Sequence, residues 1–466
     1  MRRIISLLAV PLVIVGLVWL AAVIYLQQSN LEVTGSTLLY GFVIAPLVLV
    51  LCWFGGKAIM GILSRKPEAP QVKAVPVQVA QSPAAPASRT LAILSTEVHT
   101  SAGDGLDSIL AELREGKIRP SLSERFNNQD GLPVMTSLSE SLDIESTTTF
   151  LDPWLAAAPA EHPGRSDPHK AQRLLALLEV PLLHTLELLQ SIPPLAVLSP
   201  GAEPPRRPLL VKLFTPAGWE DMLEAWLRQQ LVQLDGFNTG FVRADTQRPE
   251  LQYDALRVTS AFSTDLARMP ANSLLLLVST DSCGTEHCIE ELEQAGRLFD
   301  GSRQNGRIPG EAAALILSCP ADQIPSGFDP IAKLHPAAWG VRQKAVDAGG
   351  RTDVELLSTL LSGLLEKHPT NVDDIATVVS DCDQRIHWNA EATALISANL
   401  PALDPIMDHL ALGRAFGNTG AASSTLALAC AAACVRESAK AGFIASVADT
   451  SQRSLALLCP WPEATT

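Results

Sequence analysis

The densest cluster of chemically capable side chains in the sequence is Cys283, His287 and Cys288. Thiols and imidazoles bind zinc, but a structural zinc site needs four ligands, usually in two close pairs. The sequence has no second pair with that spacing. A redox site is typically Cys-x-x-Cys with a lowered thiol pKa, and nothing in the local sequence lowers one. We therefore interpret these residues as loop and helix-start thiols without a function, and we expect no metal.

A second polar cluster, Asp381-Cys382-Asp383 with Arg385 and His387, follows an apolar run of strand length. Open α/β sheets place their sites at the carboxyl ends of strands. Cys382 acting as a nucleophile with His387 is one hypothesis. The two neighbouring carboxylates would raise the pKa of the thiol, which disfavours it. The sequence favours a solvated loop with internal ion pairing.

Apolar periodicity after residue 90 predicts strands that alternate with helices. A proline-rich stretch at 193–208 indicates a surface connection. Trp219 and Trp226 share one helix face and are predicted to pack in the core. This alternation indicates a layered α/β fold. The predicted strands are 91–95, 209–214, 273–279, 312–317, 374–379, 443–447 and 454–458, and the predicted helices are 106–113, 168–190, 219–231, 354–365, 391–398 and 421–437.

Three stretches share a pattern of strands, glycine turns and helix starts. The first is the strand at 91–95 with its glycine turn and a helix ending in Leu113-Arg114-Glu115-Gly116. The second is the strand from Ser273, followed by Asp281-Ser282 and the Pro-Gly-Glu-Ala-Ala run at 309–313. The third is the Gly-Asn-Thr-Gly-Ala-Ala-Ser run at 417–423, which opens the last long helix. Together they resemble the thiolase-like fold in its β-ketoacyl synthase branch, where the third run begins Gly-His-Thr-Gly.

This resemblance implies a thiolase-like α-β-α-β-α domain over 91–466, with two sheets and with Leu274–Val278 and Leu455–Leu458 in buried strands. The proline-rich connection leaves room for an internal boundary near 200–208. The small residues of the third run also have a packing role, because they let a buried helix start approach the sheet closely.

The chain departs from the synthase pattern at every catalytic position. Decarboxylative condensation needs a thiolate nucleophile and, in most synthases, two histidines. Asn418 stands where the third run has its histidine, and an amide cannot carry a proton near neutral pH. The second histidine motif is replaced by a stretch that contains Cys382, and no cysteine lies between Cys52 and Cys283, where the nucleophile would be. The resemblance therefore predicts an inactive scaffold without a cofactor, with Asn418 and Cys382 as relict positions.

Two hydrophobic runs precede the domain, at 4–26 and 36–62. Each is long enough to cross a bilayer as a helix. Arginines and lysines flank their outer ends, whereas the turn between them has none. The positive-inside rule predicts a transmembrane hairpin over 1–63 with both ends in the cytoplasm, followed by a Pro/Ala-rich tether over 64–90. The alternative is a cleaved signal peptide with a periplasmic domain.

The formal net charge is −14, and residues 1–90 hold seven basic and two acidic side chains, so the remainder carries −19. Such a domain repels phosphate backbones, which excludes nucleic acid and favours a neutral or basic protein partner. Several of the cysteines lie in apolar runs, and their positions form no disulfide framework, which fits a reducing compartment.

An anchored, acidic and inactive enzyme scaffold suggests a binding role. Together with the Asn128–Val134 stretch, these features resemble the type VI secretion lipase-adapter family. That resemblance implies a protein of the bacterial inner membrane whose large domain faces the cytoplasm and holds a lipase effector. Two alternatives stay open: a rearranged synthase-like enzyme of lipid or polyketide metabolism, and a structural subunit of a membrane complex. A homo-oligomer is compatible with all three.

Overall fold

The computed structural model describes residues 90–159, 161–196, 204–242, 255–257, 259–260, 270–346, 348 and 353–462, together with Trp19. The chain divides after Pro76 into two compact units, and every described residue except Trp19 belongs to the second unit. The predicted hairpin lies outside the described residues apart from Trp19, and the tether apart from Thr90.

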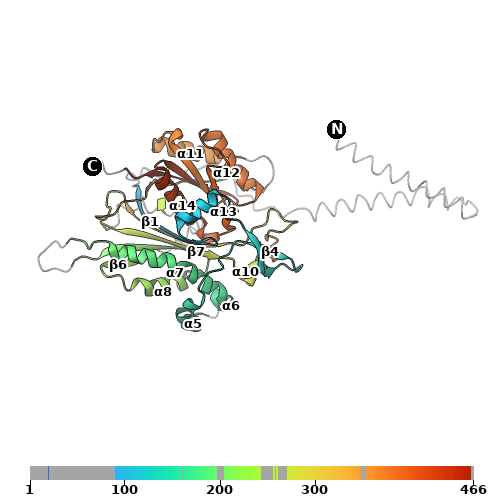
Figure 1. The fold of residues 1–466 in the computed structure, drawn as a ribbon, viewed down its shortest axis with the longest axis horizontal. Coiled ribbons are helices and arrows are strands. Elements are labelled where there is room, and N and C mark those ends of the chain that lie inside the picture. The colour runs from blue at the N-terminus through green and yellow to red at the C-terminus, as the bar shows by residue number, and fades with distance from the viewer. Residues whose placement is uncertain are drawn as a thin grey trace, which may run out of the picture. The chain divides into compact units, whose positions relative to one another are not determined.

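One mixed sheet forms the centre of the described unit (Figure 1). A separate hairpin consists of β3 (Ser121–Asn127) and β4 (Pro133–Thr136). The strands of the main sheet are β1 (Leu91–Thr100), β2 (Gly103–Asp104), β5 (Arg207–Phe214), β6 (Phe237–Val242), β7 (Leu274–Ser282), β8 (Glu311–Pro320), β9 (Ala332–Leu334), β10 (Ala338–Val341), β11 (Ile375–Ser380), β12 (His409–Ala411), β13 (Ala441–Ser446) and β14 (Gln452–Pro460). Their order is β12-β11-β13-β14-β9-β1-β8-β7-β5-β6, with β10 paired to β14 and β2 paired to β1.

The two halves of the sheet have the same topology. In the first half β5 runs parallel to β6 and β7, while β8 runs antiparallel to both β7 and β1. In the second half β11 runs parallel to β12 and β13, while β14 runs antiparallel to both β13 and β9. The prediction of two separate sheets was wrong. The short strand β9 pairs with β14 on one side and with β1 on the other, and so joins the halves.

The other elements, in chain order, are α4 (Leu106–Arg114), η2 (Glu145–Thr147), α5 (Thr148–Ala157), α6 (Pro163–Ser166), α7 (Pro168–Ser191), α8 (Glu220–Leu231), α10 (Glu286–Gln294), α11 (Glu355–Lys367), η5 (Val372–Asp374), α12 (Ile386–Asn399), α13 (Leu412–Phe416), η6 (Gly420–Ala422) and α14 (Ser423–Ser438).

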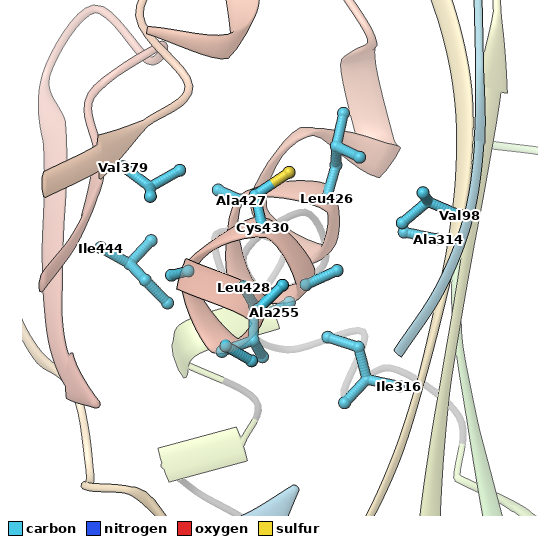
Figure 2. Close-up of a cluster of buried hydrophobic side chains, with 14 of the residues drawn as sticks. Val98, Ala255, Ala314, Ile316, Val379, Leu426, Ala427, Leu428, Cys430 and Ile444 are labelled. Carbon is cyan, nitrogen blue, oxygen red and sulfur yellow. The ribbon is translucent and has the colours of Figure 1, made fainter. Parts of the chain in front are cut away.

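Helix α14 lies between the two halves of the sheet. Figure 2 shows this helix between Val379 and Ile444 of one half and Val98 and Ile316 of the other; its labelled side chains are Leu426, Ala427, Leu428 and Cys430. The run Leu426–Val435 is buried throughout. A helix enclosed on both faces by strands needs small residues, which explains the alanines and cysteines of this stretch.

Two pairs of helices cover the outer faces of the sheet (Figure 1). Helices α7 and α8 pack with β1, β5, β7 and β8 around Trp219 and Trp226, each 4% exposed. Helices α11 and α12 pack with β11, β13 and β14. The predicted α-β-α-β-α layers and the buried tryptophans are therefore confirmed.

Among the described helices, α7 is long and apolar enough to cross a membrane. Half of its most apolar window is buried, and its leucines contact the sheet. Pro168 occupies its first turn, and the Asp167 carboxylate accepts a hydrogen bond from the backbone N–H of Lys170 at 2.9 Å. These contacts are those of a core helix.

Each predicted strand and helix is present, most with ends shifted by a few residues. The largest extensions are α12, which begins at Ile386, and β1, which continues to Thr100. Leu274–Val278 and Leu455–Leu458 lie in buried strands, as predicted. The hairpin β3–β4 and helix α5 were missed. The residues of β3 are mostly exposed, so its sequence lacks the alternation that marks a half-buried strand.

We predict that Leu428→Ala lowers the free energy of unfolding by about 2–5 kcal/mol, because it opens a cavity in a fully buried helix. Leu183→Ala is the matched control: Leu183 is 54% exposed on α7, so its loss should change stability by no more than about 0.5 kcal/mol. Urea unfolding of both variants checks this. Equal effects would contradict the central position of α14.

Candidate functional site

The motif run 417–423 lies in backbone contact with the Pro-Gly-Glu run that begins β8. The N–H of Asn418 donates to the carbonyl of Ile308 at 2.8 Å, and Pro309 pairs with Asn418 as a parallel bridge. A Cβ on Gly310 would stand 2.1 Å from the carbonyl oxygen of Phe416. Glycine is required here because the two chains approach without room for a side chain.

Asn418 is held through its backbone and is half-buried. Its side-chain amide makes no hydrogen bond with the described residues. An amide can donate and accept hydrogen bonds, but it cannot exchange a proton with a substrate near neutral pH.

Cys382 lies just beyond the carboxyl end of β11 and is fully buried. Its sulfur accepts a hydrogen bond from the Ser380 hydroxyl at 3.0 Å and lies 3.9 Å from His409 Nε2. Burial raises the pKa of the Cys382 thiol to about 12. Burial, with a smaller effect from Arg414, lowers the pKa of His409 to about 4. Both groups are therefore neutral at pH 7, and the pair has no thiolate for nucleophilic attack.

The histidine that we paired with Cys382 from the sequence was the wrong one. His387 lies on α12, whereas the imidazole beside the sulfur belongs to His409 on β12. The parallel pairing of β11 with β12 sets the Ser380 hydroxyl 2.7 Å from His409 Nε2. Tertiary pairing, rather than nearness in sequence, selects the partner.

The Asp381–Arg385 stretch is buried, which corrects the prediction of a solvated loop. Asp381 accepts hydrogen bonds from the backbone N–H groups of Val447 and Ala448, at 2.6 and 3.0 Å. Arg385 pairs with Asp383 at 2.8 Å, so the predicted internal ion pair is confirmed. The Asp381 carboxylate satisfies backbone donors just past the end of β13, whereas the Asp383 carboxylate accepts from the backbone N–H and the guanidinium of Arg385.

Helix α13 lies between the backbone of Cys382 and Asn418. Helix α13 starts against the Cys382 backbone, where a Cβ on Gly413 would stand 2.8 Å from the Cys382 carbonyl oxygen. The chain reaches Asn418 five residues later. Cys382 and Asn418 thus lie in one region of the domain, around α13 and the 417–423 run, which we call the corner. Among the described residues, no hydrogen bond joins their side chains.

A charged cluster forms the opposite side of this corner. The Asp281 carboxylate, at the carboxyl end of β7, accepts a hydrogen bond from the N–H of Ala421 at 2.9 Å and lies 3.7 Å from the Lys170 ammonium. The same ammonium donates to the Cys288 sulfur at 3.4 Å. This cluster was not predictable from local sequence, because Lys170 precedes Cys288 by 118 residues.

The glutamate of the Pro-Gly-Glu run, Glu311, is fully buried and paired with Arg173 of α7. Glu311 also accepts hydrogen bonds from the Ser282 hydroxyl at 2.6 Å and from the N–H of Ser139 at 2.7 Å. Such a pair is costly to break from one side, since the remaining charge stays buried. It fixes three segments around the corner.

His99 connects an aspartate with a serine in the order found in serine hydrolases. Its Nδ1 lies 2.7 Å from Asp104, and its Nε2 lies 3.0 Å from the Ser139 hydroxyl. A nucleophile must be accessible to its substrate. Ser139 is only 4% exposed, and the exposed member of the array is the Asp104 carboxylate. We interpret the array as a structural tie between β1 and the segment after β4.

Within the described part of the chain, no group of three or more histidine, cysteine or carboxylate side chains is arranged to hold a metal ion. The thiols of Cys283 and Cys288 interact with each other and with Lys170 instead. Cys288 lies in the first turn of α10, as the predicted helix start implies, and Cys283 lies just after β7.

Several solved structures share this fold. One is a type II polyketide synthase ketosynthase in complex with its acyl-carrier protein (11% identity, 80% of this chain and 100% of that one, TM-score 0.54). A second is a β-ketoacyl synthase from Burkholderia phymatum (10% identity, 80% and 100%, TM-score 0.52). A third is an oxazolomycin ketosynthase domain from Streptomyces albus (12% identity, 81% and 75%, TM-score 0.51).

The described unit therefore has the thiolase-like α/β fold of the ketosynthases, as predicted. At these identities the likeness concerns the fold alone. No protein-family model and no curated protein sequence matches the chain.

We predict that Gly420→Ala lowers the free energy of unfolding by at least about 2 kcal/mol. Gly420 has a φ of +49°, and an added Cβ would stand 1.8 Å from the Asp281 carboxylate that holds Ala421. Gly363→Ala is the matched control, because its Cβ would meet no atom within 4 Å; replacing a helical glycine should raise stability by roughly 0.5–1 kcal/mol. Chemical unfolding of both variants checks this, and a neutral Gly420→Ala would contradict the contact.

We also predict that His409 contributes to acid sensitivity. Its pKa of about 4 in the folded chain lies below the usual value near 6.5, so the unfolded chain binds the proton more readily. Stability is therefore lost as the pH falls from about 6.5 towards 4, by up to about 3 kcal/mol from this residue. In His409→Gln the loss of unfolding free energy between pH 7 and pH 4 should be smaller by up to about 3 kcal/mol. An unchanged loss would show that His409 is accessible to protons in the folded chain.

Proposed function

We propose that this chain is a non-catalytic, membrane-anchored adapter that uses a ketosynthase-like domain to bind a protein. The observation that carries the proposal is the state of Cys382, which is fully buried with a pKa near 12. In the resemblance to the synthases Cys382 lies in the stretch that replaces the second histidine motif, and a buried, neutral thiol there supports the loss of proton transfer.

Two further features of the chain support the loss of condensation chemistry. Asn418 replaces the other motif histidine and keeps only hydrogen-bonding capacity. The stretch before β7 supplies no cysteine that could form an acyl-enzyme. The glycines around Gly310 and Gly417 are explained by close packing alone, so their retention does not require turnover.

A binding role is supported by a rigid apolar turn before β12. Ile406 is 76% exposed and Met407 is 71% exposed. The Asp404 carboxylate accepts hydrogen bonds from both of their N–H groups, at 2.8 and 3.0 Å, which fixes the turn. Large apolar side chains held rigidly in solvent are typical anchors for a protein partner. The net negative charge of the domain would speed association with a basic partner.

The resemblance to type VI secretion lipase adapters suggests that the partner is a lipase effector. In that arrangement the hairpin over 1–63 anchors the chain in the bacterial inner membrane, and the domain faces the cytoplasm. Binding requires no cofactor.

The competing candidate is a synthase-like enzyme with a rearranged site, favoured by the retained fold and glycine motif. One of the similar structures is a ketosynthase in complex with its acyl-carrier protein, so acyl-carrier-protein thioesters are the substrates to offer. A structural subunit without a soluble client remains the third candidate.

The first experiment separates binding from catalysis. The purified full-length chain is given acyl-CoA and acyl-carrier-protein thioesters, and release of free thiol and of carbon dioxide is followed. We expect no turnover above the uncatalysed rate. Turnover that Asn418→Ala or Cys382→Ala abolishes would overturn the proposal.

The second measurement is partner capture from native lysate. We expect one dominant protein, with binding weakened at least roughly tenfold by the double change Ile406→Asp and Met407→Asp, because charge at an apolar anchor costs more than about 1.4 kcal/mol. Val232→Asp is the matched control, since Val232 is 81% exposed on another surface. Asn418→Ala should leave binding within roughly threefold. A lipase among the captured proteins supports the adapter role, and its absence refutes that part of the proposal.

A further inference from the structure

Two thiols meet at the carboxyl end of β7. Cys283 follows the strand, and its N–H donates to the carbonyl of Gly310 at 3.1 Å, which fixes its backbone. Cys288 lies in the first turn of α10, where its N–H donates to the hydroxyl of the capping residue Thr285 at 3.4 Å. The amino end of a helix carries partial positive charge and favours an anionic sulfur.

A buried ammonium stands beside the Cys288 sulfur. Lys170 Nζ is 3.4 Å from that sulfur and 3.7 Å from the Asp281 carboxylate, and its side chain is 13% exposed. Although burial disfavours its charge, the Asp281 carboxylate raises the pKa of Lys170, so the ammonium persists. It therefore provides a fixed positive charge at the thiol.

The two sulfurs differ in their protonation. A hydrogen bond from the Cys283 thiol, opposed by burial and aided by Lys170, lowers the pKa of Cys288 to about 7. The same contact raises the pKa of Cys283 well above its usual range. Near pH 7 about half of the Cys288 thiol is therefore ionised, while the Cys283 thiol stays protonated. This is the arrangement of a nucleophilic cysteine with a resolving partner.

Cys283 and Cys288 are both buried, and among the described cysteines with a resolved pKa shift only Cys288 has a lowered pKa. Cys283 and Cys288 are each 9% exposed, whereas Cys319, Cys382 and Cys430 are fully buried. Burial raises the pKa of Cys319 to about 12, and it also raises the pKa of the more exposed Cys459. A small oxidant would therefore meet a thiolate at Cys288 first.

We propose that Cys283 and Cys288 form a redox-active dithiol that reacts with small disulfides and closes an intramolecular disulfide. The Cys288 thiolate attacks one sulfur of the oxidant R–S–S–R, whose S–S bond breaks and releases one thiolate. Cys283 then loses its proton to solvent, and its sulfur attacks Cys288 in the mixed disulfide, releasing the second thiolate. The two cysteines are oxidised by two electrons, and the oxidant is reduced to two thiols. This site is separate from the proposed partner-binding role.

Lys170 acts as a positioning residue because it stabilises the attacking thiolate without reacting. Its other partner, Asp281, also holds the N–H of Ala421 at the start of the glycine motif. Oxidation removes the negative sulfur from Lys170 and leaves Asp281 as its anionic partner. The dithiol thus lies one contact away from the corner that contains Asn418.

The test treats the full-length chain with oxidised glutathione at pH 7 and maps products by mass spectrometry. We expect the parent to lose two hydrogens and to yield a crosslinked Cys283–Cys288 peptide. Cys283→Ser should stop at a glutathione mixed disulfide on Cys288, and Cys288→Ser should leave Cys283 unreacted. Cys459→Ser is the matched control and should behave as the parent. A persistent mixed disulfide in the parent, or faster reaction at Cys459, would overturn the proposal.

The rate of this reaction tests the role of Lys170. In the parent it should level off above about pH 8, because the thiolate is then fully formed. Lys170→Met should slow it at pH 7 by up to about tenfold, the effect of one pKa unit. Lys170→Arg, which keeps the charge, should restore most of the rate. Lys117→Met, at an exposed lysine, is the control. A rate that rises steadily through pH 9 in the parent, or equal rates for Lys170→Met and Lys117→Met, would refute it.

Discussion

The burial of α14 between two β-layers is the constraint on which the rest of this domain depends. A helix enclosed on both faces must be made of small side chains, and the Leu426–Val435 run is mostly alanine and cysteine. The layers can then approach closely enough for Gly310 to touch the backbone of Phe416. The glycine motif is therefore maintained by packing, and a fold of this type can keep its motif glycines after it has lost a reaction.

The polar groups around the motif divide into two kinds. On the second half of the sheet, Cys382 and His409 are buried and neutral, because burial disfavours the charged form of each. On the first half, Lys170 and Asp281 are paired; the carboxylate raises the pKa of Lys170, although burial raises the pKa of Asp281 itself. At pH 7 Cys382 therefore carries no thiolate, whereas the pKa of Cys288, beside Lys170, is lowered to about 7.

Much of the fold could be predicted because burial leaves a local pattern. The continuous apolar runs of β7 and β8 identified buried strands, and the spacing of Trp219 and Trp226 identified a core helix. The three-residue strand β9 has no such pattern, so its joining of the two halves was not predictable. The hairpin β3–β4 was missed because its exposed residues do not alternate.

The sequence by itself determined that Asn418 stands in the Gly-x-Thr-Gly run and that no cysteine lies between Cys52 and Cys283. Only the tertiary structure decided what the remaining polar residues do. The histidine beside Cys382 is His409, 27 residues along the chain, and not the nearby His387. Lys170 contacts Cys288 although 118 residues separate them. The physical reason is that hydrophobic burial follows a periodicity along the chain, whereas the charge of a thiol or imidazole depends on desolvation and on neighbours within a few ångströms. Those neighbours come from strands and helix ends that meet only in the folded domain.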